Sequence, residues 1–285
     1  MPRLALFLPL LVALAGCAGD DAAPVAEPTS AQEVTDAMLA GFERNVGSVE
    51  GFTVVADGAE GRYTVSDDTA SVDRVTLHVV PTGSMGPPTG AAQLLYNHVP
   101  NVARLAQGLR GATFEGRATR DGRPVYVLVT DDPTAMLGGG APAPAGDREL
   151  RLYVDPETFD VLEIYQSFEA DTTAFTTRLI YSDFREADGL RLPYRVRQVT
   201  TGLNQAISPN ERIAIGGQIG LALRQTEQMP MGPERTARTR ELEAELRRVN
   251  EGIDEAELEV ESVRVGVPEP APPAPAGPQP LPSGP

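Results

Sequence analysis

Residues 177–199, TRLIYSDFREADGLRLPYRVRQV, form two runs of mixed apolar and polar residues that meet at Asp188-Gly189. An Asp-Gly pair between two such runs is a strong short-range signal for a tight β-hairpin turn. In the second run, three apolar residues alternate with three arginines: Leu192, Tyr194 and Val196 against Arg191, Arg195 and Arg197. This period of two predicts an antiparallel strand with one face in the core and one face in water.

The chain on both sides of this hairpin has the same character. From Ala112 to Thr201 we expect about six successive antiparallel strands, with further turns at RDGR (Arg120–Arg123) and DPETFD (Asp155–Asp160). Four more strands are expected outside this region: Gly51–Asp57, Gly61–Ser66, Val72–Val80 and Glu257–Val267. Hairpin connections dominate and no β-α-β alternation appears, which indicates one antiparallel sheet.

Two helices are expected before the six strands. The first begins at SAQE (Ser30–Glu33), a capping box in which each of the two side chains bonds the other residue's backbone amide. Its apolar stripe is Val34, Met38, Phe42 and Val46. The second helix spans Ala91–Leu109, and Pro100 should kink or divide it. Its apolar side is Leu94, His98, Val102, Leu105 and Leu109.

A helical hairpin is expected at residues 208–252, before the last strand. SPNE (Ser208–Glu211) supplies a Ser cap, a Pro in the first turn and a Glu at the third position, and a second helix should run from about Glu234 to Val249. The elements together predict an α+β fold. We expect one strongly curved antiparallel sheet, an open half-barrel, with helices on its concave side and this hairpin inserted before the last strand.

Two motifs in the strand-rich region resemble the outer-membrane lipoprotein-sorting superfamily, the LolA/LolB-like half-barrels. Members carry a Trp/Tyr-aliphatic-Asp-x-x-Thr hairpin and then a strand that ends Asp-aromatic-Arg-x-x-x-Gly-x-x-x-Pro. The matching residues are Tyr153, Val154, Asp155 and Thr158, then Asp183, Phe184, Arg185, Gly189 and Pro193. The motifs cover the middle third of the chain, and the order of elements extends the resemblance over residues 30–267.

The resemblance implies a binding protein without catalysis. Members of the family hold acyl chains in the concavity of the sheet, under helical lids. The lining residues that it implies here are Leu162, Ile164 and Phe168, on one face of a strand, with Leu192, Tyr194 and Val196. The alternative is that these six residues pack against the helices as ordinary core, which is the usual place of apolar side chains.

The first sixteen residues have the layout of an export signal. Arg3 gives a positive start, and the apolar run Leu4–Leu14 is too short to span a bilayer. LAGC (Leu14–Cys17) resembles the bacterial lipobox, in which the Cys thiol is acylated and the peptide is cut just before it. The alternative is an ordinary secretory signal cut after ALA (Ala13–Ala15), which would leave Cys17, the chain's one cysteine, as a free thiol.

We therefore expect a signal peptide at 1–16, a lipidated N-terminus and flexible tether at 17–29, a folded domain at 30–267 and a disordered Pro-rich tail at 268–285. Two or three acyl chains anchor a protein effectively permanently. In enteric bacteria an Asp after the lipidated Cys favours the inner membrane, so Ala18 favours the outer membrane. The protein is expected in the cell envelope, facing the periplasm.

Charge and composition restrict the function. The formal net charge is −16, and every basic residue is an arginine. An acidic chain repels nucleic acid and anionic headgroups, which argues against nucleic-acid binding. There is no tryptophan, and His78 and His98 are the only two histidines.

Catalytic and metal motifs are not found in the sequence. An enzyme would need His78 or His98 to meet an acid or a nucleophile in a cleft, and no serine-nucleophile motif accompanies them. The acid pairs Asp67–Asp68 and Asp131–Asp132 lack the spacing of a calcium loop, and Gly138–Gly140 lacks the lysine of a phosphate loop. No cofactor, metal or catalytic residue is predicted.

Two function classes remain. The first is an anchored binder of an acyl chain, a lipid or a lipidated partner, in lipoprotein sorting or envelope maintenance. The second is a protein-interaction or envelope-stress sensor module with a filled sheet, which would contact an envelope protein through the tail or the helical hairpin. A continuous dry groove favours the first class, and an exposed apolar hairpin favours the second.

Overall fold

The computed structural model describes residues 27–47, 49–68, 75–81, 94–131, 146–170 and 173–266. Cys17, the predicted signal peptide, residues 17–26 of the predicted tether and the tail 268–285 lie outside the described residues. Within the described ranges, no helix has both the length and the apolar character needed to cross a membrane.

The helices and strands follow the predicted order. The helices are α1 (Ala31–Val46), α2 (Leu95–His98), α3 (Val102–Gly108), η3 (a 3₁₀ turn, Leu203–Ala206), α4 (Pro209–Glu227) and α5 (Pro233–Glu251). The strands are β1 (Gly51–Ala56), β2 (Ala59–Val65), β3 (Val75–Pro81), β4 (Thr113–Arg120), β5 (Arg123–Thr130), β6 (Asp147–Val154), β7 (Val161–Ala170), β8 (Thr173–Ala187), β9 (Leu190–Thr201) and β10 (Asp254–Val265).

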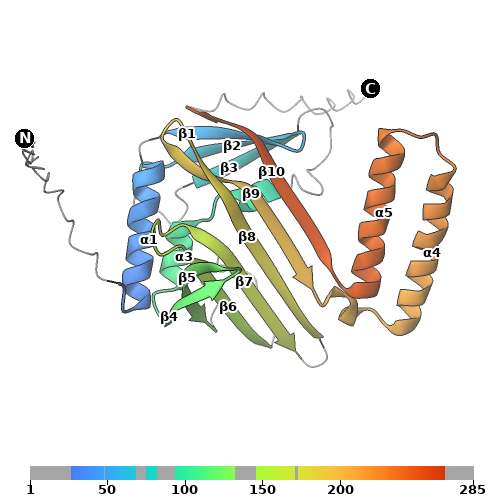
Figure 1. Ribbon diagram of the computed structural model, residues 1–285, viewed down its shortest axis with the longest axis horizontal. Coiled ribbons are helices and arrows are strands. Elements are labelled where there is room, and N and C mark those ends of the chain that lie inside the picture. The colour runs from blue at the N-terminus through green and yellow to red at the C-terminus, as the bar shows by residue number, and fades with distance from the viewer. Residues whose placement is uncertain are drawn as a thin grey trace, which may run out of the picture.

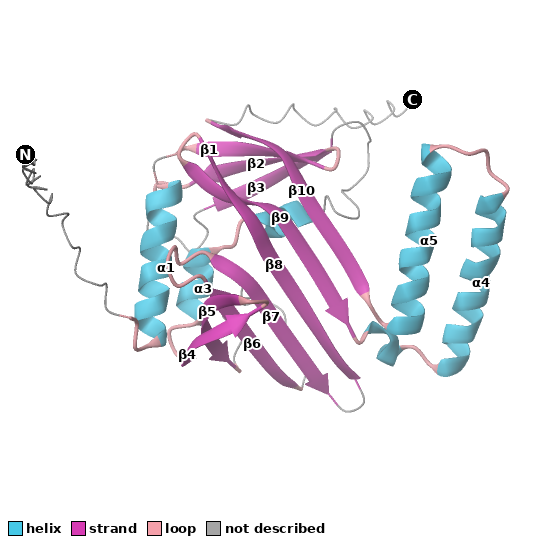
Figure 2. Cartoon of the chain, viewed as in Figure 1, coloured by secondary structure: helices cyan, strands magenta, loops and turns pink. Residues whose placement is uncertain are grey.

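All ten strands belong to one antiparallel sheet, which is not closed into a barrel. The strand order is β3-β2-β1-β10-β9-β8-β7-β6-β5-β4, so β3 and β4 lie at opposite ends (Figure 1). The α+β class and the single antiparallel sheet are thus confirmed. Figure 2 shows the helices α1 and α3 beside the strands and the α4–α5 hairpin beyond them.

Strand β10 joins the two parts of the sheet. Its first half, Asp254–Glu259, pairs with β9, and its second half, from Val260 to Val265, pairs with β1. A bulge interrupts the β1 pairing where Ala56 opposes Val260 and Val55 opposes Ser262. Because β10 pairs with β9 only as far as Arg195, the beginning of β9 has a strand neighbour, β8, on one side only.

Side chains from two helices cap this unpaired edge of β9. The Asn45 amide on α1 accepts from the Arg191 backbone N–H and donates to the Arg191 carbonyl, both at 2.7 Å. His98 Nε2 on α2 donates to the Pro193 carbonyl at 2.7 Å. The edge thus gains three hydrogen bonds that a neighbouring strand would otherwise supply. Pro193 needs no partner for a backbone N–H, which explains why proline is tolerated here.

The helices bury one face of the sheet. Val34, Met38, Phe42 and Val46 on α1 are buried in the main core, as their spacing predicts. Two buried tyrosines fix α2: Tyr63 Oη donates to the Leu95 carbonyl at 2.7 Å, and Tyr181 Oη donates to the Asn97 carbonyl at 3.0 Å. The interior of the domain therefore depends on hydrogen bonds to the α2 backbone as well as on apolar contact.

Three local expectations are refined. Pro100 divides the predicted second helix completely, into α2 and α3. Ser30 caps α1 as predicted, but the Glu33 carboxylate accepts from the Thr29 N–H at 2.6 Å, so the capping box is incomplete. The box is complete at Ser208 and Glu211.

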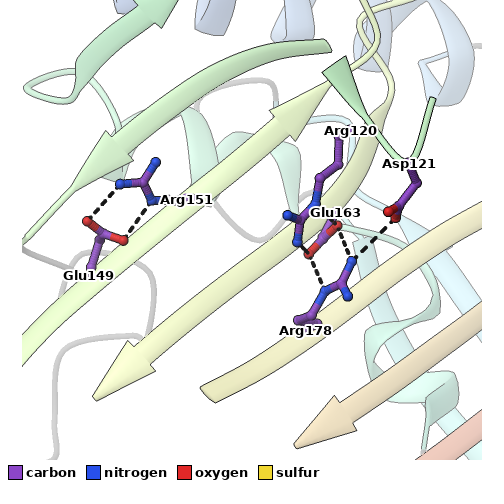
Figure 3. Close-up of polar contacts among 6 residues, drawn as sticks. All are labelled: Arg120, Asp121, Glu149, Arg151, Glu163 and Arg178. Atoms are coloured by element: carbon purple, nitrogen blue, oxygen red, sulfur yellow. Dashed lines mark hydrogen bonds and ion pairs between the residues drawn. The ribbon is translucent and has the colours of Figure 1, made fainter. Parts of the chain in front are cut away.

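The other face of the sheet carries a cluster of charged residues (Figure 3). Glu163 on β7 is 3% exposed and accepts from both Arg120 and Arg178, at distances between 2.6 and 3.1 Å. Arg120 reaches it from the end of β4, with its guanidinium 4.8 Å from the centroid of the Tyr153 ring. Burial raises the pKa of Glu163, but hydrogen bonds and charge from Arg178 and Arg120 outweigh it and lower the pKa overall. This cluster ties β4, β7 and β8 together.

The α4–α5 hairpin has a small core of its own. Ile219, Leu242 and Val249 are buried in it, with Ile215, Ala222, Leu223 and Leu246 packed around them. These are the apolar positions that the sequence predicts. At the base of the hairpin, Leu203 N–H donates to the Gly252 carbonyl, and Asn204 donates to the Asn250 carbonyl. The hairpin is thus held to the sheet at one end only and projects beyond the sheet (Figure 1).

We expect Glu163→Gln to lower the free energy of unfolding by about 2–4 kcal/mol, measured by urea denaturation. The new amide nitrogen would face guanidinium donors in a nearly buried site. Glu149→Gln is the matched control, since Glu149 pairs with Arg151 on the same strand and is 38% exposed (Figure 3). It should cost less than about 1 kcal/mol. Equal effects of the two variants would contradict a special role for Glu163.

Candidate functional site

Two neighbouring cavities lie on the helix-covered face of the sheet. The first, of about 250 Å³, is bounded by α1, by the linker between α2 and α3, by the turn between β6 and β7 and by the beginning of β9. Its wall is largely apolar: Met38, Phe42, Val46, Val99, Phe159 and Leu192 contribute to it. It lies at the edge of β9 that β10 leaves unpaired.

The second cavity, of about 340 Å³, lies between the same linker and strands β7, β8 and β9. Its sheet side combines the apolar Ile164 and Leu179 with the polar Gln166, Thr177 and Gln198. Val99 and Pro100 line both cavities. The two cavities are therefore separated by a short piece of linker between two helices of four and seven residues.

The rim of the first cavity is polar and structured by the β6–β7 turn. Asp155 accepts from the amides of Glu157 and Thr158, at 2.9 and 3.1 Å. Arg191 Nε donates to Asp160 at 2.9 Å, which fixes the turn to β9. Arg44 on α1 also lines the cavity. Two guanidinium groups and one carboxylate therefore surround an apolar interior.

Phe159 shows how the local sequence shapes this cavity. The Phe159 N–H donates to the Asp155 carbonyl at 3.0 Å and closes the turn. The φ of Phe159 is +59°. Bulky residues rarely adopt this left-handed conformation, and such strain costs on the order of 1 kcal/mol. The strained backbone sets the aromatic ring in the cavity wall, 6.1 Å from the Tyr126 ring.

The structure separates the six predicted lining residues. Leu192 lines the first cavity and Ile164 the second. Val196 is completely buried in the main core. Tyr194 is half-buried against the core, with the Arg185 guanidinium 4.7 Å from the centroid of its ring. Two of these four residues thus have an ordinary packing position, which is the alternative that the sequence left open.

The expectation that Leu162, Ile164 and Phe168 share one face is wrong at Leu162. The register of β7 shifts where Tyr153 opposes Glu163 and Val154 opposes Val161, so Leu162 lies in a bulge. A bulge turns the side chains that follow it to the opposite face. Leu162 packs with Val125 and Val127 instead of with the main core.

Phe168 lies near the other end of β7, where its ring packs against Phe175 at 5.1 Å. It contributes to neither cavity.

Sequence reasoning missed the residues that come from outside the strands. Arg44, Asn45 and the Val99–Pro100 linker belong to helices or loops, and only the break at Pro100 had a signal in the sequence. Thr177 and Leu179 were also missed, although their alternation along β8 could have indicated a shared face with Ile164.

His98 is fully buried and is part of the packing, and among the described residues no acid or nucleophile is bonded to it. Since a carbonyl only accepts, the bond to Pro193 places the ring proton on Nε2, and Nδ1 has no partner among the described residues. Burial lowers the pKa of His98 to about 4, against a small opposing effect of the Pro193 carbonyl. The ring is neutral at ordinary pH.

Among the described residues, Glu163 is the one buried carboxylate. The Glu163 carboxylate is saturated by two guanidinium groups, and its pKa is lowered, which is unsuited to a general base. No group of three or more His, Cys, Asp or Glu side chains is placed to hold a metal ion in the part of the chain that the structure covers. The backbone of His78 lies in β3, but its side chain is outside the described part.

Comparisons with family models, with curated proteins and with solved structures found no match for this chain.

We expect acid to weaken the native state through His98. The unfolded chain takes up a proton at the ordinary histidine pKa of about 6.5, whereas the folded chain does so only near pH 4. The neutral His98 therefore contributes about 3 kcal/mol to the free energy of unfolding above about pH 6.5. This contribution is lost as the pH falls to about 4.

The measurement is urea denaturation of the wild type and of His98→Gln, whose amide can still donate to Pro193, between about pH 7 and pH 4. Acid titration of the carboxylates affects both proteins and cancels in the difference. The wild type should lose stability relative to the variant as the pH falls. A difference that stays constant across this range would contradict a neutral, buried His98.

Proposed function

We propose that this protein is a lipid-anchored envelope protein that binds an acyl chain, a lipid or a lipidated partner without catalysis. In this proposal it is a LolA/LolB-like half-barrel, its helices line the concave side of the sheet, and Cys17 carries the anchor in the outer membrane. The observation that supports binding most directly is the pair of cavities with a common wall at Val99 and Pro100.

The sizes of the cavities favour a ligand that uses both. Sites for drug-sized ligands usually measure about 300–1,000 Å³, so the first cavity, of about 250 Å³, lies below this range and the second, of about 340 Å³, lies at its lower end. A shift of the Val99–Pro100 linker would join them into one groove beneath α2 and α3. Burying about eight methylene groups there would contribute roughly 6 kcal/mol, which is enough for a useful affinity.

The linker is well suited to such a shift. The two helices that it joins are short, and Pro100 supplies no backbone N–H that would have to be satisfied in either position. Three buried hydrogen bonds, from Tyr63, Tyr181 and His98, hold α2 in the observed position. Opening would exchange these bonds for contacts with the acyl chain.

The second candidate function is a protein-interaction or envelope-stress sensor module. The exposed apolar side chains of the α4–α5 hairpin favour it, since Ile213 is 75% and Leu221 53% exposed. In that case the cavities are packing defects and hold no ligand.

The experiment is lipid capture by residues 18–285, exported to the periplasm and purified without the anchor. Organic extraction and mass spectrometry against a mock preparation should find lipid in stoichiometric amount. Leu179→Arg places a charge in the second cavity and should weaken uptake of a fluorescent long-chain fatty acid by at least about tenfold. Met231→Arg, at a residue 86% exposed on the hairpin, should leave uptake unchanged.

Thermal unfolding of both variants checks that they fold. Absence of lipid, together with no probe uptake by the folded wild type, would refute the binding proposal and favour the sensor module.

The anchor is tested separately by the intact mass of the full chain extracted from membranes. The mass should correspond to a chain that begins at Cys17 and carries acyl groups. A soluble product that begins at Gly16 would show that the ordinary secretory signal is used instead.

A further inference from the structure

The hairpin α4–α5 carries an unusual share of the exposed apolar surface. Five large apolar side chains are exposed within the described residues, and three of them, Ile213, Leu221 and Met231, belong to this hairpin. Because the hairpin meets the sheet only at its base, nothing in the described chain covers its outer side (Figure 1). A projecting element with exposed apolar residues is typical of an interaction surface.

Helix α4 is apolar on two sides. One side packs on α5 through Ile215, Ile219 and Leu223. At 100° per residue, a second side carries Ile213, Gly217 and Leu221, spaced by four residues, with the exposed Arg224 among them. A surface helix normally has one apolar stripe, and a second stripe indicates a second partner.

Glycines give this second side its shape. A Cβ added at Gly217 or Gly220 would meet no atom within 4 Å, so the space beside them is open. Glycine is among the poorest helix formers, and three of them (Gly216, Gly217 and Gly220) lie inside α4. Their lack of side chains allows the backbone of another helix to approach closely.

The stripe is complementary to itself. Ile213 and Leu221 lie four residues before and four residues after Gly217. A second α4 that runs antiparallel, with the twofold axis at Gly217, places each Ile213 beside Leu221 of the second copy. A twofold contact between two identical helices requires such an arrangement.

The charge of the hairpin also favours a second copy of this chain as the partner. Residues 208–252 contain seven arginines and seven glutamates, whereas the whole chain has a net charge of −16. Two copies that met through the acidic remainder of the chain would repel each other, whereas two hairpins of balanced charge would not. A neutral hairpin also has no attraction for an anionic membrane surface.

We propose that α4 is a homodimer interface, in which Ile213, Gly217 and Leu221 pack on the same residues of a second copy and the two hairpins join through their α4 helices. The partner is a second copy of this chain, and the contact is independent of what the cavities bind. One helix of 19 residues is about 28 Å long, so the interface is small and the dimer is weak.

Cysteine cross-linking in the full-length membrane protein tests this interface directly. Gly217 lies on the proposed axis, so Gly217→Cys brings two thiols together, and mild oxidation should give a disulfide-linked dimer on a non-reducing gel. Gln225→Cys is the matched control: it lies eight residues from the proposed axis, so the two thiols would be about 24 Å apart along the helices, and this variant should remain monomeric. The unmodified chain, whose one cysteine is Cys17, shows any cross-link that arises from that residue.

A second pair of variants tests the packing. Ile213→Arg and Leu221→Arg, each combined with Gly217→Cys, should reduce the cross-linked fraction by at least about tenfold at equal protein level. Cross-linking of Gln225→Cys as efficiently as Gly217→Cys, absence of a dimer with both, or a product with the mass of a different protein would each overturn the proposal.

Discussion

Strand β10 lies between β1 and β9 in the sheet, but it pairs with each of them over only half of its length. It pairs with β9 as far as Glu259 and then with β1. The beginning of β9 is therefore left with unpaired backbone groups at Arg191 and Pro193, which cannot be buried without partners. Asn45 and His98 supply those partners, and in doing so they fix the end of α1 and the position of α2 over the sheet. The first cavity lies at this junction, where a side-chain cap takes the place of a strand.

The two faces of the sheet are stabilised by different chemistry. On the helix-covered face, neutral hydrogen bonds fix α2: Tyr63 and Tyr181 donate to its Leu95 and Asn97 carbonyls, and its His98 donates to the Pro193 carbonyl on β9. On the other face, Glu163 on β7 and its two arginines connect β7 to its neighbour β8 and to β4, which is adjacent to neither strand (Figure 3). Under the proposed binding function, the covered face would rearrange at the Val99–Pro100 linker while the charged face keeps the strands in register. Rigidity on one face and adjustability on the other are what the proposed binding function requires.

The sequence predicts local features of this fold well and long-range ones poorly. The Asp188-Gly189 turn, the break at Pro100 and the spacing of Leu242, Leu246 and Val249 each depend on residues within a few positions of one another, and the structure has all three. The cap of β9 depends on Asn45 and Arg191, which are 146 residues apart, and no periodicity reports such a pair. The face of Leu162 depends on a one-residue bulge, which a strict alternation cannot anticipate. Of the residues that line the two cavities, the sequence therefore predicted only Ile164 and Leu192.

The position of β10 also determines the order in which the domain can be completed. Strands β1–β3 come first in the chain, but within the described sheet they join the other strands only through β10, the last strand. A contact between the two ends of a chain is formed late, because the loop that it closes is the longest. During synthesis, β4–β9 can assemble by successive hairpins while β1–β3 wait as a separate three-stranded piece. Truncation before Asp254 would thus leave two fragments of sheet, each with an exposed edge open to aggregation.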